Sequence, residues 1–232
     1  MKQALTAGLP ALELTLSEQQ IDTFCRFGQA LIEKNQVMNL TAITEPEAVA
    51  RLHFLDCMAL LGIQDFRGKS VIDMGCGAGF PGVPLKIAEP TIQLTLLDSL
   101  KKRVDWLAQV LPELGVEAQC ISARAEEYVT PHREQFDFAV SRAVARLNLL
   151  AELCLPYVKV GGAFVAMKSV DCDEELSQAA RGIGLLGGRV EKIVDYPIPG
   201  TDAVHRAVVI RKAKKTPPQY PRRFSKIKQS PL

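Results

Sequence analysis

The sequence predicts an α/β protein with a doubly wound, mostly parallel sheet of seven strands, preceded by a helical extension. Three observations support this prediction. Short apolar segments alternate with amphipathic segments from residue 70 onward, and a glycine-rich turn follows the first apolar segment. The last two apolar segments, 189–196 and 205–212, are separated by about eight residues. That connection is too short for a crossover helix, so these strands should form an antiparallel hairpin.

The extension precedes the first convincing strand. Ser17 with Gln20, and Thr44 with Glu47, have the spacing of capping boxes, and apolar residues then recur at helical intervals. After the extension, the expected strands are 70–75, 92–98, 118–122, 136–144, 161–169, 189–196 and 205–212. One helix is expected to begin near residue 82, and three further helices are expected at 99–114, 147–158 and 173–186. We therefore divide the chain into a helical extension (1–66), an α/β domain (67–212) and a basic, proline-containing tail (213–232).

Composition and charge narrow the class of protein. No apolar run approaches the roughly 20 residues that span a bilayer, and Pro10 and Glu13 interrupt any signal-like segment. We expect a cytoplasmic protein without a membrane anchor. The six cysteines lack C-x-x-C spacing and the three histidines are scattered, so we expect no metal site.

The positive charge is concentrated at one end of the chain. Residues 203–232 contain nine Lys or Arg and no acidic residue, whereas the first 202 residues carry 19 basic and 26 acidic residues, a net charge of −7. Such a segment suits contacts with nucleic-acid phosphates, although a solubilising tail has the same composition. We expect the last 20 or so residues to be mobile without RNA, because Pro217, Pro218 and Pro221 break regular structure and the charges repel.

The turn "VIDMGCGAGFPG" fits two cofactor motifs. Gly77, Gly79 and Gly82 spell G-x-G-x-x-G, the motif of dinucleotide-binding folds. Gly75, Gly77 and Gly79 spell G-x-G-x-G, which is the usual turn for S-adenosylmethionine. Both cofactors bind at the carboxyl end of the first strand.

Three further features bear on the choice of cofactor, and two of them favour S-adenosylmethionine. Asp73 precedes the first glycine by two residues, where it can interact with a cationic amino group directly or through water, but would repel a pyrophosphate. Asp98, 19 residues after Gly79, can accept both ribose hydroxyls of either cofactor. The terminal hairpin is typical of methyltransferase sheets, and it is the strongest of the three.

The absence of two sequence features reduces the number of candidate methyl-acceptor atoms. The segment after the fourth strand reads "AVSRAVARL" and lacks the Asp/Asn-Pro-Pro-aromatic motif of amino-directed base methylation. Methylation of pyrimidine C5 needs a cysteine nucleophile, but Cys154 and Cys172 lie on or beside expected helices. Guanine N7 has a free lone pair and needs mainly in-line alignment. Arg142 and Arg146 follow the fourth strand and suit guanine O6 or phosphate, while a salt bridge at a helix start is the alternative for Arg142.

The chain resembles the bacterial small-subunit ribosomal RNA methyltransferase G family, also called glucose-inhibited division protein B. The resemblance extends over nearly the whole chain, through "NQVMNLTAITEPEAVARLHFLDCMAL", "VIDMGCGAGFPGVPLKI", "LTLLDSLKKRVDWL", "ARAEE", "SRAVARL", "LCLPYVKVGGAFVAMK" and "TPPQYPRR". It implies a Rossmann-like class I methyltransferase fold and S-adenosylmethionine-dependent N7 methylation of one guanosine in 16S ribosomal RNA. It also suggests a monomer. We expect the RNA to lie within a ribosomal particle, although the sequence does not distinguish naked RNA, a partly assembled particle and a mature subunit.

The resemblance also assigns residues. Together with the turn, it implies cofactor contacts from Asp73, Gly75, Gly77, Gly79, Phe80, Asp98, Ser99, Ala125, Glu126 and Arg142, the last of which would also position the substrate. The candidates for RNA contact are Arg51, His53, Arg124, Arg146, Lys168, Arg222 and Arg223. A structural hydrogen bond to Asp56 is the alternative for His53, and a surface position is the alternative for Lys168.

Two other functions compete with this interpretation. An enzyme of the same fold could act on another RNA position, a small molecule or a protein. A nucleotide-binding regulator could use the turn only as a sensor. The basic tail and the family resemblance speak against a small molecule or a protein as the substrate. The intact turn, Asp98 and the loop arginines speak against the regulator.

Overall fold

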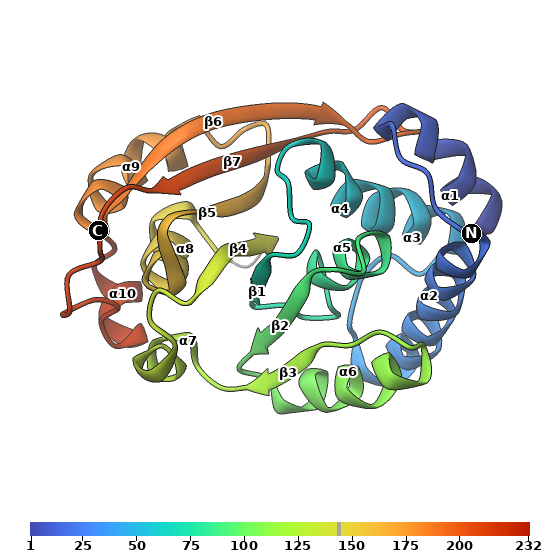
Figure 1. Cartoon of the computed structure of the whole chain (residues 1–232), viewed down its shortest axis with the longest axis horizontal. Coiled ribbons are helices and arrows are strands. Elements are labelled where there is room, and N and C mark those ends of the chain that lie inside the picture. Colours follow the sequence, from blue (N-terminus) through green and yellow to red (C-terminus); the bar gives the residue numbers. More distant parts are fainter. Residues whose placement is uncertain (143–144) are drawn as a thin grey trace.

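The structure, a computed structural model, describes residues 1–142 and 145–232, and within these ranges seven strands form one sheet (Figure 1). The strand order is β3-β2-β1-β4-β5-β7-β6. Strands β1 to β5 are parallel to one another, and β7 pairs antiparallel with both β5 and β6. The predicted fold class, including the C-terminal antiparallel hairpin, is therefore confirmed.

The elements have the following bounds. The strands are β1 (Ser70–Met74), β2 (Gln93–Asp98), β3 (Gln119–Ser122), β4 (Phe136–Arg142), β5 (Val158–Ser169), β6 (Gly188–Pro197) and β7 (Val204–Lys212). The helices of the extension are α1 (Lys2–Gly8), α2 (Glu18–Met38), α3 (Pro46–Val49) and α4 (Asp56–Met58), with a π-helical turn at Ala50–Leu55 between the last two. The later helices are α5 (Gly82–Ala88), α6 (Lys101–Glu113), α7 (Ala125–Tyr128), α8 (Leu147–Cys154), α9 (Asp173–Leu185) and α10 (Phe224–Gln229). Short 3-10 turns lie at Leu9–Leu12, Ala59–Gly62, Thr130–His132 and Leu155–Tyr157.

Local details confirm one sequence expectation and differ from two others. The capping box of Ser17 and Gln20 is present at the start of α2, which runs on to Met38. The second expected box is wrong: Glu45 caps α3 by accepting a hydrogen bond from the Ala48 N–H. Strand β5 begins three residues earlier than expected. Ala143 and Val144, inside the "SRAVARL" motif, lie outside the described residues.

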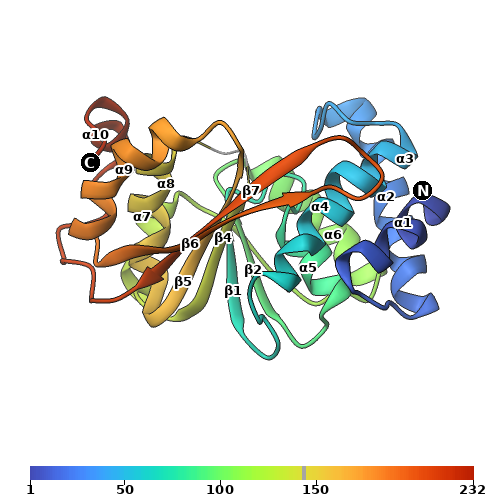
Figure 2. The same cartoon turned by 90° about the horizontal axis from the view of Figure 1, so that it is seen from above.

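Helices cover both faces of the sheet. Alternate residues of β1 enter opposite apolar clusters, with Val71 in one and Ile72 in the other, and Phe138 and Ala139 of β4 do the same. Figure 2 shows α8 and α9 on one side of the sheet and α2, α5 and α6 on the other. Burial on both faces explains why the strands read as continuous apolar runs instead of alternating polar and apolar residues.

The extension shares the apolar core of the α/β domain. Phe27 of α2 has its ring centroid 5.9 Å from that of Phe80, in the glycine-rich turn, and 6.1 Å from that of Trp106 in α6. Phe54 stacks against Phe27 and lies 6.3 Å from Phe80. Aromatic side chains bury large areas, so this cluster joins the extension to the turn.

The tail is packed against the domain, so the expectation of a mobile tail is wrong. The ammonium of Lys212 is fully buried and donates to the Val158 carbonyl and to the Thr216 hydroxyl. Arg222 donates three hydrogen bonds to the buried carboxylate of Glu152 on α8. Ile227 of α10 is also fully buried. Charge counting could not detect these anchors because their partners lie 54 to 70 residues away.

We predict that Arg222→Ala lowers the free energy of unfolding by about 2 kcal/mol, because it leaves the Glu152 carboxylate buried without its cation. Arg223→Ala is the matched control, since Arg223 is exposed, and it should change the free energy by less than about 0.5 kcal/mol. Urea unfolding of both variants measures the difference. Equal stability of the two variants would contradict a structural role for Arg222.

Candidate active site

A pocket of about 490 Å³ opens at the carboxyl ends of the central strands. Met74 and Gly75 at the end of β1, Asp98 at the end of β2 and Arg142 at the end of β4 all line it. The strand order reverses between β1 and β4, and ligands of open α/β sheets bind at such a switch point. The parallel sheet thus brings together strand ends that are 23 to 68 positions apart in the sequence.

The glycine-rich turn forms one wall of the pocket. Gly75 (φ 70°) and Gly77 (φ 56°) adopt the left-handed conformation that side chains disfavour, and both line the pocket. Gly79 does not line it: a Cβ there would lie 2.6 Å from Val83 Cγ2, so this glycine allows the turn to pack on α5. Phe80 closes the turn against the extension and also faces the pocket.

Asp73 lies beneath the turn and not among the residues that line the pocket. Its Oδ2 atom accepts a hydrogen bond from the Gly82 N–H at 2.7 Å. Its Oδ1 atom is buried and has no hydrogen-bond partner among the described residues. Burial raises the pKa of Asp73 to about 7. The predicted direct contact with a methionyl amino group therefore does not fit this arrangement, and only an indirect contribution remains.

Asp98 is held in a defined position at the end of β2. Its Oδ2 atom accepts from the Gly77 N–H at 2.9 Å, and its Oδ1 atom accepts from the Leu100 N–H at 2.8 Å. The Arg103 guanidinium lies 3.9 Å from Oδ2. Each carboxylate oxygen has a further lone pair, so Asp98 can still accept hydrogen bonds from a ligand. Ser99 lies next to it in the wall of the pocket.

The segment after β3 and the tail form the opposite end of the pocket. Ala125 and Glu126 line it, and Phe224 of α10 joins them. Arg124 lies at the rim, with its guanidinium carbon 5.9 Å from the centroid of the Phe224 ring. Phe224 was not among the site residues expected from the sequence, because the tail was expected to be mobile. No local sequence pattern indicates where Phe224, the single aromatic residue of the tail beyond Tyr220, would lie.

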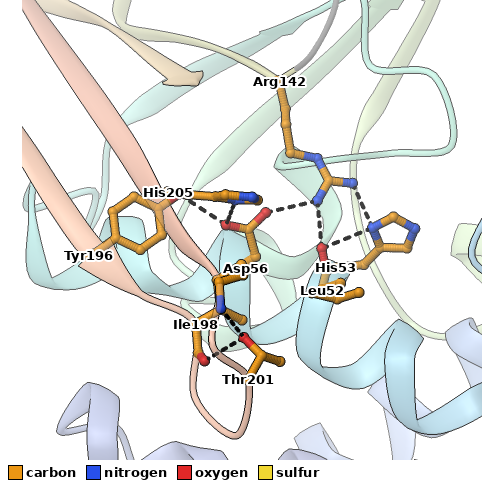
Figure 3. Close-up of polar contacts among 9 residues, drawn as sticks. Leu52, His53, Asp56, Arg142, Tyr196, Ile198, Thr201 and His205 are labelled. Carbon is orange, nitrogen blue, oxygen red and sulfur yellow. Dashed lines mark hydrogen bonds and ion pairs between the residues drawn. The ribbon is translucent and has the colours of Figure 1, made fainter. Parts of the chain in front are cut away.

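Arg142 connects the pocket to the extension (Figure 3). Its Nη1 atom donates to the Leu52 carbonyl and to Asp56 Oδ2, both at 3.1 Å, and its Nη2 atom donates to His53 Nδ1 at 2.9 Å. The guanidinium carbon lies 4.7 Å from the Phe80 ring centroid, within the range of a cation–π contact. Arg142 thus lines the pocket and is also half of an ion pair, and its role toward the cofactor and the substrate stays a prediction.

Asp56 is the buried anion of this network. Its side chain is completely buried, and its Oδ1 atom accepts from the Tyr196 hydroxyl at 3.0 Å and pairs with His205 Nδ1 at 2.9 Å. The hydrogen bond to Asp56 raises the pKa of His205. The predicted hydrogen bond between His53 and Asp56 is wrong, since His205 of β7 takes that place.

His53 is buried and neutral. Burial and the nearby Arg142 cation lower its pKa to about 3. Its ring stacks on Phe80 with centroids 4.5 Å apart, and its Nε2 atom lies 2.9 Å from the Thr41 hydroxyl oxygen. An imidazole in this state cannot act as a cation toward RNA phosphate.

The remaining candidates for RNA contact fall into two groups. Arg124, Arg146 and Arg223 are exposed. The other three are engaged within the protein: Lys168 is paired with Glu175 at 2.6 Å, Arg222 with Glu152, and Arg51 with Glu47. The RNA contacts themselves stay predictions.

Residues 1–142 and 145–232 contain neither a metal-binding cluster nor a helix that could cross a membrane. No group of three or more His, Cys, Asp or Glu residues in these ranges could hold a metal ion. No helix in the same part of the chain is long and apolar enough to cross a membrane.

The model of the family described as rRNA small subunit methyltransferase G matches residues 19–199. The chain belongs to this family. It is 42% identical over 225 residues to the ribosomal RNA small subunit methyltransferase G of Clostridium botulinum strain Loch Maree, covering 95% of this chain and 94% of that protein. It is 43% identical over 236 residues to the protein of the same name from Alkaliphilus oremlandii, covering 100% and 99%.

Solved structures with low sequence identity share the fold. A SAM dependent methyltransferase from Aquifex aeolicus is 16% identical, with a TM-score of 0.52, covering 70% of this chain and 92% of that chain. A predicted O-methyltransferase from Agrobacterium tumefaciens is 18% identical, with a TM-score of 0.51, covering 69% and 80%. The predicted family, enzyme class and S-adenosylmethionine dependence are confirmed by the family membership together with this fold.

We predict that Asp73→Asn removes a pH-dependent loss of stability. The folded pKa of Asp73, about 7, is above the ordinary value of about 3.9, so the folded state binds more protons between these pH values. Its contribution to stability is therefore complete below about pH 4 and lost as the pH rises through 7. Asparagine keeps an acceptor for the Gly82 N–H without acquiring charge.

Urea unfolding of Asp73→Asn and the wild type between pH 4 and pH 8 measures this difference. The stability of the variant relative to the wild type should rise by about 3 kcal/mol across the range. Comparing the two proteins cancels the opposite contribution of His53, whose low folded pKa adds stability as the pH rises from about 3 to 6.5. A pH-independent difference would contradict the assignment.

Proposed function

We propose that this protein transfers the methyl group of S-adenosylmethionine to N7 of one guanosine in small-subunit (16S) ribosomal RNA. Membership of the methyltransferase G family supports the substrate class. The choice of N7 as the methyl acceptor rests on His53. The pKa of this histidine is about 3, and the lone pair of its Nδ1 atom already accepts a hydrogen bond from Arg142. An acceptor that bears a proton needs a base to remove it, but guanine N7 bears none.

The cofactor residues follow from the shape of the pocket. The two pocket-lining glycines, Gly75 and Gly77, let the cofactor approach the backbone closely, and Phe80 covers the turn. Asp98 would accept the ribose hydroxyls with its remaining lone pairs, next to Ser99. Ala125 and Glu126 would border the adenine. When bound, S-adenosylmethionine supplies an electrophilic methyl group on its sulfonium sulfur.

Arg142 would act by position and charge. Three of its hydrogen bonds are made within the protein, and a guanidinium has five N–H groups. The remaining donors are available to an anionic group in the pocket, a carboxylate or a phosphate. Its rigid attachment to Asp56 suits a reaction that depends on the alignment of two bound molecules.

The RNA would meet the protein around the rim of the pocket. Arg124, Arg146 and Arg223 are exposed cations that can contact phosphates, and Arg223 adjoins the pocket residue Phe224. We infer that the guanosine is presented by a ribosomal particle to a monomeric enzyme in the cytoplasm, because an open rim leaves room for a large partner.

The function is tested by labelled-methyl transfer to small ribosomal subunits from a strain that lacks the endogenous enzyme, followed by nucleoside analysis. We expect one labelled N7-methylguanosine confined to the small-subunit RNA. Label on another nucleoside atom would overturn the choice of N7 and leave the cofactor assignment standing. No label from protein that binds S-adenosylmethionine would overturn the proposed substrate.

We predict that Arg142→Lys lowers kcat/KM about 10- to 100-fold in this assay, because one ammonium cannot replace the hydrogen bonds of the guanidinium fork. Lysine keeps a cation near the buried Asp56, whereas alanine would remove it and mix loss of activity with loss of stability. Arg206→Lys is the matched control, since Arg206 pairs with Asp173 and Asp195 away from the pocket. Similar kcat/KM values for the two variants would remove Arg142 from the proposed mechanism.

A further inference from the structure

Thr41 lies where the extension meets the pocket, and its hydroxyl has a defined set of neighbours. The side chain lines the pocket beside His53, Phe80 and Arg142. Its Oγ1 atom lies 2.9 Å from His53 Nε2 and accepts a hydrogen bond from the Ile43 N–H at 3.0 Å. Its own N–H donates to Asn35 Oδ1 at 2.8 Å, so backbone and side chain are both held.

The proton positions in this group follow from Arg142. A guanidinium is only a donor, so His53 Nδ1, 2.9 Å from Arg142 Nη2, must present a lone pair. His53 Nδ1 also lies 3.2 Å from the Leu52 carbonyl, but a proton there would point toward the N–H of Arg142. The ring is neutral at physiological pH. Its single proton is therefore on Nε2, which donates to Thr41.

The Thr41 hydroxyl has one hydrogen-bonding capacity left, that of a donor. A hydroxyl has two acceptor lone pairs and one O–H donor. Both lone pairs are used, one by His53 Nε2 and one by the Ile43 N–H. The O–H bond must point in the remaining direction, and Thr41 lines the pocket. The structure thus holds a neutral, oriented donor at the end of the pocket that Arg142 also lines.

We propose that Thr41 is a positioning residue for the methyl acceptor, and that its hydroxyl donates a hydrogen bond to O6 of the target guanine. This inference rests on the proposed function. Guanine carries N7 and O6 as adjacent acceptors on one edge. A donor at O6 orients that edge and leaves the N7 lone pair free to attack the methyl group.

Two observations favour guanine O6 over the carboxylate of the cofactor. A carboxylate forms its strongest hydrogen bonds with charged donors, and Arg142 keeps unused N–H groups in the same part of the pocket. Thr41 also belongs to the helical extension, whereas the proposed cofactor residues follow β1, β2 and β3 of the sheet. A neutral donor brought in by the extension suits a carbonyl oxygen of the second substrate.

The test compares Thr41→Val, which keeps the shape and removes the hydroxyl, with Thr41→Ser, which restores the hydroxyl. For Thr41→Val we expect kcat/KM for methyl transfer to small ribosomal subunits to fall about tenfold. Its Kd for S-adenosylmethionine, measured by calorimetry without RNA, should stay within twofold of the wild type. Thr41→Ser should stay within threefold of the wild type in both measurements. Thr23→Val is the control, because the Thr23 hydroxyl only bonds the Gln19 carbonyl within α2.

Each other result overturns the inference in a distinct way. Unchanged kcat/KM in Thr41→Val would show that the hydroxyl donates to no substrate. A parallel loss in Thr41→Ser would mean that the site needs the methyl group instead of the hydroxyl. A tenfold weaker Kd for S-adenosylmethionine in Thr41→Val would assign the hydrogen bond to the cofactor carboxylate. If the wild type methylates an atom other than guanine N7, the proposed function fails first, and the Kd values show that the cofactor site is intact.

Discussion

The buried carboxylate of Asp56 is the interaction on which the rest of the site depends. An ionised carboxylate without solvent is costly unless charges and hydrogen bonds compensate it. Here the partners come from distant segments: Arg142 from the end of β4, and Tyr196 and His205 from the terminal hairpin. Because Asp56 belongs to the extension, its carboxylate obtains these hydrogen-bond partners only when the extension, the sheet and the hairpin are packed together.

The same network determines the chemical state of the pocket. Asp56 holds the Arg142 guanidinium. Burial, together with this cation, lowers the pKa of His53 and keeps the ring neutral, and Arg142 also occupies the His53 Nδ1 atom. Phe80 completes the arrangement, with His53 and Arg142 packed on its ring. Hydrogen bonds and ring packing therefore hold the side chains at this end of the pocket, which offers donors instead of a base. This arrangement suits an acceptor with its own lone pair.

Much of the site could be predicted because its residues lie next to recognisable local patterns. The turn glycines and Asp98 follow apolar strands, and the carboxyl ends of parallel strands meet at one edge. Lys168 and Arg222 could not be assigned in this way. Their carboxylate partners, Glu175 and Glu152, are brought to them by the packing of α9 and α8. Phe224 lines the pocket because the tail is held against α8 by the contacts of Arg222 with Glu152.

By itself the sequence determined the alternation of strands and helices, the reversed final hairpin, the cofactor turn and the family. These properties are encoded by spacing and by short motifs, which act over a few residues. Only the tertiary structure decided which charged side chains are free and which atom of His53 carries the proton. The physical reason is that a buried charge or donor takes its state from partners far away in the chain, and only folding makes them neighbours.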